Sequence, residues 1–192
     1  MLEVLQESDA TYRHEGVFDR SLLTVTYSVN LDEHDARVRA GRREIRDEFI
    51  LAALLSVPED HLGQVSPRFE RVLRRTDSAH LATILEDPEG GLWGQRRAQP
   101  AVDVRSIEIT STSLKRGCSV AHRWAGYGPR TITTSASVST FELTEASHYG
   151  IGLQMPDGEC VMMPASFVPQ RWSSARWRFA ELVYGQFRDL NG

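Results

Sequence analysis

The stretch from Tyr149 to Phe167 gathers side chains that bind metals or act as nucleophiles. It holds Cys160, one of two cysteines, and three of the four methionines, and His148 stands immediately before it. A thiol beside an imidazole is the pair that a cysteine nucleophile needs, and thiolate with thioether ligands suits copper. The spacing of these residues decides whether the stretch is a reactive site or scaffold.

The sequence MPDGE at 155–159 predicts a tight turn, because proline and glycine supply the backbone angles that a hairpin requires. The register that follows places Leu153 opposite Val161 on an apolar face. The same register separates His148 from Cys160 by roughly 20 Å at the rise of a strand, far beyond hydrogen-bond reach. The stretch is therefore interpreted as scaffold, with methionines filling the core and the C-terminal helix covering its glycine-bearing face.

Other catalytic and cofactor motifs do not assemble. Cys118 and His122 have a four-residue spacing, but the remaining Cys–His pair is the one that the hairpin separates, so no zinc site is predicted. The glycines of 90–97 lack a preceding strand and a following Walker lysine. The chain has no G-x-S-x-G or S-x-x-K motif. We predict neither a metal nor a cofactor.

One segment, from Leu114 to Arg130, combines cations with aromatic rings, inside a window from Glu108 to Glu142 that has no carboxylate side chain between its ends. Its glycines and proline are interpreted as loops around a strand. Cations next to rings can hold an anionic group and stack on a planar one. The candidate ligand-binding residues are Lys115, Arg116, His122, Arg123, Trp124, Tyr127 and Arg130. The alternative is an edge strand protected by charge, with Trp124 in the core.

Charge and composition restrict the class of protein. The net charge is −4, and residues 1–97 hold 18 acidic against 13 basic residues, so nucleic acid is an unlikely partner. The chain is arginine-rich, with Lys115 as its one lysine. No apolar run is long enough to span a membrane, and the first residues do not resemble a signal peptide. Two cysteines fit reduced thiols, and we expect a cytoplasmic protein.

The first 88 residues predict a strand followed by a helical cluster. Residues 21–30 are rich in β-branched and aromatic side chains, as in a strand. The next segment, to Val57, has helical periodicity with Asp32 as N-cap, and Gly41 is expected to split it. Ser66 and Pro67 predict a short helix to about Arg75, and residues 77–86 predict another.

The rest of the chain changes character after a Gly- and Pro-rich linker at 89–101. Residues 102–114 and 130–143 alternate as strands do, and residues 173–190 predict an amphipathic helix that Ser173 or Ser174 can cap. This order predicts an α+β fold in a single domain, residues 1–192: lobe 1–88, linker 89–101, and a β-rich lobe 102–192. We expect a mostly antiparallel sheet, with the N-terminal helical cluster and the C-terminal helix packed on it.

These features support a non-catalytic binding protein that acts through protein–protein contact, as an immunity, adaptor or chaperone-like factor. The expected partner is another protein or a second copy of the chain. The alternative is an enzyme or carrier for an anionic compound, including aromatic ones, with His122 as the acid/base candidate. A weaker alternative is nucleic-acid binding. A pocket lined by His122, Arg123 or Trp124 would favour the enzyme or carrier, and an exposed apolar patch would favour the partner.

Overall fold

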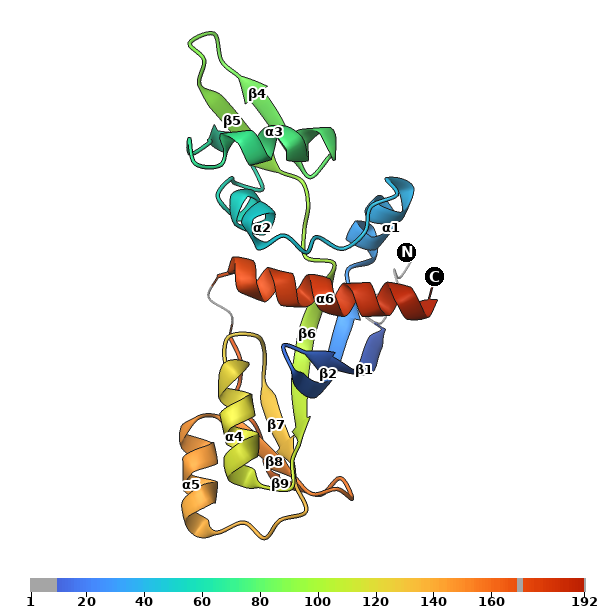
Figure 1. The fold of residues 1–192 in the computed structure, drawn as a ribbon, viewed down its shortest axis with the longest axis vertical. Helices are drawn as coiled ribbons and strands as arrows, with labels where there is room; N and C mark the ends of the chain where they lie inside the picture. The colour runs from blue at the N-terminus through green and yellow to red at the C-terminus, as the bar shows by residue number, and fades with distance from the viewer. Residues whose placement is uncertain (1–9, 169–170, 192) are drawn as a thin grey trace, which may run out of the picture. The chain divides into compact units, whose positions relative to one another are not determined.

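The computed structural model describes residues 10–168 and 171–191. The chain forms two compact units, each made of two stretches of sequence. Unit 1 comprises residues 1–29 and 103–170, and unit 2 comprises residues 30–102 and 171–192. The described residues form six helices, one sheet of six strands and one of three, which is an α+β composition (Figure 1).

The six-stranded sheet belongs to unit 1 and is mixed. Its strands lie in the order β1, β2, β6, β7, β8, β9. The β1–β2 and β8–β9 pairs are antiparallel, whereas β6–β7 and β7–β8 are parallel, which corrects the expected mostly antiparallel sheet. The strand bounds are β1 Thr11–Phe18, β2 Ser21–Val29, β6 Val102–Thr110, β7 Arg130–Thr133, β8 Ile151–Gln154 and β9 Cys160–Met162.

Two helices connect the parallel strands and explain why those strands are parallel. Helix α4 (Leu114–Arg123) joins β6 to β7, and α5 (Thr140–His148) joins β7 to β8. The helices lie side by side, α4 against β7 and α5 against β8 (Figure 1). Parallel neighbours need such crossovers, while antiparallel ones need only a hairpin. The sequence analysis predicted a strand within 114–130 and another over 130–143. These predictions are wrong where α4 and α5 form, although residues 130–133 are the strand β7.

The hairpin of β8 and β9 forms as predicted at its turn but not beyond it. The backbone N–H of Met155 donates to the carbonyl of Glu159 at 2.8 Å. A bulge then shifts the register, so that Leu153 pairs with Met162 and not with Val161. A shift of one residue exchanges the two faces of a strand. Val161 is accordingly 44% exposed and Met163 75% exposed, where core packing was expected.

The glycine-bearing face of β8 is covered by the chain that follows β9. A Cβ at Gly152 would lie 2.7 Å from the ring of Pro164, and one at Gly150 would lie 2.8 Å from the Cβ of Ala165. Gly150 also has a φ of 64°, which favours glycine. The close approach expected of the C-terminal helix is therefore made by residues 162–165.

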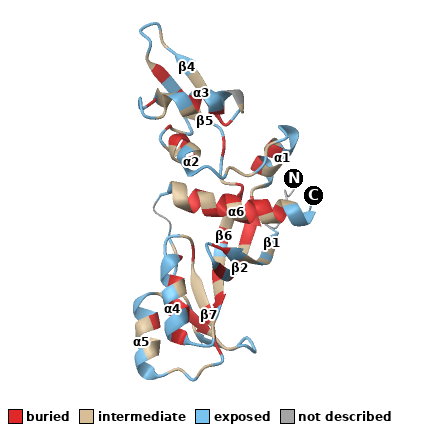
Figure 2. Cartoon of the chain, viewed as in Figure 1, coloured by how far each residue is buried: buried red, intermediate tan, exposed pale blue. Residues whose placement is uncertain are grey.

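Unit 2 contains four helices and the three-stranded sheet. The helices are α1 Leu31–Arg39, α2 Glu48–Leu55, α3 Glu70–Ser78 and α6 Ser174–Asn191. The strands are β3 Gly63–Gln64, β4 Ala82–Glu86 and β5 Leu92–Arg96, with β5 in the centre and both pairs antiparallel. Helix α2 packs against α3 and α6, and buried positions recur along α6 (Figure 2). No helix among the described residues is long and apolar enough to cross a membrane.

The helical predictions for this unit are confirmed where caps and periodicity agree. The helix pair splits at Gly41, whose φ is 61°, and Ser173 caps α6 by accepting from the N–H of Arg176. The N-cap of α1 is Asn30, not Asp32, since its side chain accepts from the N–H of Glu33. The expected helix at 77–86 is wrong, because residues 82–86 form β4. Strand β5 lies within the segment expected to be a linker.

A buried ion network joins α1, α6 and the segment before β6. The guanidinium of Arg37 donates to Glu33 at 2.6 Å and to both carboxylate oxygens of Glu181 at 2.6 and 2.8 Å. Glu181 also accepts from the indole of Trp177 and the N–H of Ile45. Burial acts to lower the pKa of Arg37, but the bonds and charges of Glu181 and Glu33 outweigh it and raise that pKa. Each of the three charged groups thus has an oppositely charged partner within unit 2.

Candidate functional site

The segment predicted to bind a ligand is helical over its first half. Leu114, Gly117, Cys118 and Ala121 are buried at helical spacing, and the residues between them are exposed except for the half-buried Val120. Gly117 fits closely against β7, because a Cβ there would lie 2.9 Å from the side chain of Ile132. The residues predicted to bind a ligand lie in different surroundings. Most of them fall into two groups.

The first group serves structure. His122 packs edge-on against the ring of Tyr149, with ring centroids 4.1 Å apart, and Trp124 is buried against Tyr127. Arg130 donates to the carbonyls of Ala121 and Tyr149, which ties the end of α4 to the end of α5. Burial lowers the pKa of Arg130. The burial of Trp124 agrees with the alternative that placed it in the core.

The second group lines a cavity of about 390 Å³ in unit 1. Helix α4 contributes Arg116, Val120 and Arg123, which lie on one face because they are four and three residues apart. The other walls are the β1–β2 turn and the carboxyl end of β6. The hydroxyl groups on the wall belong to Ser21, Thr110, Ser111 and Thr112, and the aliphatic side chains to Leu22, Ile109 and Val120. Lys115 does not line this cavity.

A third arginine enters the cavity from the β1–β2 turn. Phe18 pairs with Ser21, so Asp19 and Arg20 form a two-residue turn with φ values of 45° and 64°. Such turns prefer asparagine and glycine, and a left-handed arginine costs about 1–2 kcal/mol. The turn nevertheless places Arg20 on the cavity wall.

The charge of the cavity is uncompensated. Arg123 donates to the hydroxyl of Ser21 at 2.8 Å, a neutral partner. Arg20 and Arg116 make no hydrogen bond or ion pair with any residue in the described part of the chain. None of the ten described residues on the wall is acidic. Three guanidinium groups around one hollow with no carboxylate create a positive potential that attracts anions.

Sequence reasoning found Arg116 and Arg123 but missed Arg20 and the hydroxyl groups. The feature of the sequence that could have indicated the hydroxyl groups is the Ser/Thr run 110–113, which lies between a strand and a helix. Ligands in sheets with parallel strands bind where the strands end, and this run lies at the end of β6. The signal was lost because α4 was interpreted as a strand.

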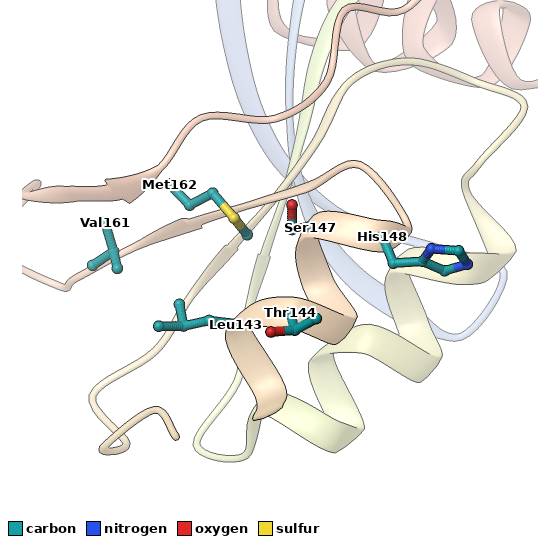
Figure 3. A pocket seen from close by; sticks show the side chains of 6 residues that line it. All are labelled: Leu143, Thr144, Ser147, His148, Val161 and Met162. Carbon is teal, nitrogen blue, oxygen red and sulfur yellow. The ribbon is translucent and has the colours of Figure 1, made fainter. Parts of the chain in front are cut away.

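A second hollow, of about 570 Å³, lies between α5 and β9. Leu143, Thr144 and Ser147 face Val161 and Met162 across it, while the ring of His148 points away from Met162 (Figure 3). Met162 is the inward-facing residue of a strand that forms one edge of the sheet. The described residues around this hollow are mainly apolar and include no pair of groups suited to proton transfer.

The groups on the described wall of the first cavity are suited to binding an anion. Its wall consists of guanidinium, hydroxyl and aliphatic groups, and none of these exchanges a proton near neutral pH. Among the described residues, no three His, Cys, Asp or Glu side chains gather closely enough to hold a metal. No family model, curated protein or solved structure matches the chain.

Proposed function

We propose that this protein binds an anionic small molecule reversibly in the cavity of unit 1. The observation that carries the proposal is the set of three arginines on one wall, two of them without any partner in the described chain. The absence of an acid or base from the described wall favours a carrier or sensor over an enzyme. We expect this function in the cytoplasm, because two cysteines in a chain of this length fit reduced thiols.

Calorimetric titration at low salt with sulfate, citrate and inorganic phosphate tests this function. At least one anion should bind, and Arg116→Gln should weaken binding roughly tenfold or more, since a hydrogen bond to a charged group contributes about 1.5–3 kcal/mol. Lys115→Gln is the matched control, because it removes the same charge from the next position of the same helix, away from the cavity. Equal losses in both variants, or no binding by the unmodified protein, would refute the proposal.

Protein contact is the second candidate function, and the exposed edge at β9 favours it. Edge strands pair readily with other strands, and Val161 and Met163 present apolar side chains there. We propose a second copy of the chain as the occupant, with the two β9 strands pairing antiparallel about a twofold axis. An isologous pair of this kind would extend the sheet and cover the hollow beside α5.

Sedimentation velocity over a wide concentration range tests the second candidate. The protein should form a dimer, and Val161→Glu should shift it to the monomer. Val17→Glu is the control, because Val17 is also an exposed apolar residue of unit 1, on the strand β1 at the opposite edge. A protein that stays monomeric at every concentration does not use this edge for self-association.

A further inference from the structure

We infer that the ligand of this cavity carries a phosphate monoester dianion on a compact aliphatic or hydroxylated body. The inference rests on the proposed anion-binding function and adds the class of ligand.

The number of charges favours a dianion. Arg20, Arg116 and Arg123 contribute three positive charges, and the described wall contributes no negative one. A monoanion such as a carboxylate would leave two of these charges repelling each other. A phosphate monoester carries close to two negative charges at neutral pH, so it compensates the site more fully.

The donors suit an anion with several acceptor oxygens. Each guanidinium presents a planar fork of N–H groups that matches phosphate geometry. The hydroxyls of Thr110 and Thr112 make no hydrogen bond within the described chain, so both can donate to a ligand. Ser113, the N-cap of α4, makes no side-chain cap bond, which leaves the N-terminal end of this ten-residue helix electrostatically positive beside the cavity.

The rest of the wall indicates the body of the ligand. The cavity volume of about 390 Å³ exceeds the needs of a free anion and falls in the range of small-molecule sites. Leu22, Ile109 and Val120 form its apolar part. The rings of Trp124 and Tyr127, which were expected to stack on an aromatic ligand, pack against each other instead. The wall therefore favours an aliphatic or hydroxylated body over a planar ring.

A comparison of two dianions across pH tests the class of ligand. Glycerol phosphate should bind at pH 7.5 and weaken about tenfold at pH 5, because its second pKa of roughly 6 makes it a monoanion there. Sulfate stays a dianion, so its affinity should be unchanged over the same range. Arginine lines the cavity and stays charged, while Asp19 and Glu108, which pairs with Arg13, are the carboxylates directly adjacent in sequence to the described wall residues. Because the charge of sulfate does not change over this pH range, the sulfate titration is the control for any effect of protonating these carboxylates or His122.

Variants and competing ligands complete the test. Arg20→Gln and Arg116→Gln should each weaken glycerol phosphate roughly 10- to 100-fold, while Lys115→Gln should not. Circular dichroism shows whether each variant is folded, and Arg116→Lys keeps the charge should the glutamine variant unfold. Butyrate binding as tightly as glycerol phosphate, or phosphate binding that ignores pH, would overturn the phosphate assignment and leave anion binding intact. A short oligonucleotide that binds more tightly, with steep salt dependence, would also overturn it. Failure of every anion would overturn both proposals.

Discussion

Replacement of Arg37 by methionine tests whether unit 2 depends on its buried ion network. Arg37 is 1% exposed and Glu181 is 0% exposed, and the guanidinium makes four hydrogen bonds to Glu33, Glu181 and the carbonyl of Gln99. Methionine fills a similar space without charge. The variant therefore leaves two buried carboxylates that retain only neutral donors.

The expected loss is about 3–5 kcal/mol of unfolding free energy, the usual cost of leaving a buried charge unpaired. Domains of this size unfold with about 5–15 kcal/mol, so the variant should lie near the limit of stability. Neutralising the orphaned carboxylate should recover part of the loss. Glu181→Gln keeps an oxygen that can accept from Trp177, so Arg37→Met with Glu181→Gln should be more stable than Arg37→Met alone.

Urea unfolding followed by tryptophan fluorescence measures these differences, because three of the four tryptophans lie in unit 2. Arg39→Met is the control, since Arg39 is an exposed arginine on the same helix. It should change stability by less than about 0.5 kcal/mol. A loss below about 1 kcal/mol for Arg37→Met, or a double variant less stable than the single one, would refute the reasoning.

Three further outcomes follow from local geometry. Arg20→Gly should raise the unfolding free energy by up to about 1 kcal/mol, because the relief of left-handed backbone strain exceeds the cost of the added chain entropy. The same variant should lose anion binding. A lower unfolding free energy in urea titration would contradict this. Gly117→Ala should lower the unfolding free energy by about 1–3 kcal/mol, because the added methyl group overpacks against β7. Gly126→Ala should not lower it, because Gly126 has open space around it, and thermal melts measure the difference. Cys160 should react with a thiol reagent at once, and Cys118 should react only on unfolding. Burial, and to a smaller extent nearby glutamates, raise the pKa of the Cys118 thiol. Rapid reaction of two thiols per folded chain would contradict this.

The sequence predicted elements whose local signals agree with one another. Strand β2 and the amphipathic helix α6 carry clear periodicities, and Ser173 supplies a cap. The turn at 155–159 also forms as expected. The last turn of α6 departs from this pattern, because Leu190 falls on the apolar stripe but is 67% exposed.

The missed elements carry conflicting signals. Asp77 predicts the start of a helix, but its carboxylate accepts from the N–H of Ile84 on β4, and His80, with a φ of 57°, ends α3. Helix α5 begins in a Ser/Thr-rich segment, and a capping box between Ser139 and Glu142 sets its first residue. Hydroxyl-bearing residues favour strands by β-branching and favour helix starts by capping, so composition alone does not separate the two.

Arg116 and Arg123 line one cavity although the secondary structure predicted for their segment is wrong. Arg116 and Arg123 stood out because their surroundings lack carboxylates, and that property of the sequence does not depend on whether the segment is a strand or a helix. Their convergence does depend on it, since a spacing of seven places two residues on one face of a helix but on opposite faces of a strand. Arg20 is more than 90 residues away in the chain and reaches the same cavity through a turn whose sequence is unfavourable for its backbone. The proposed anion would account for a strained residue that also contributes an unpaired charge to a cavity.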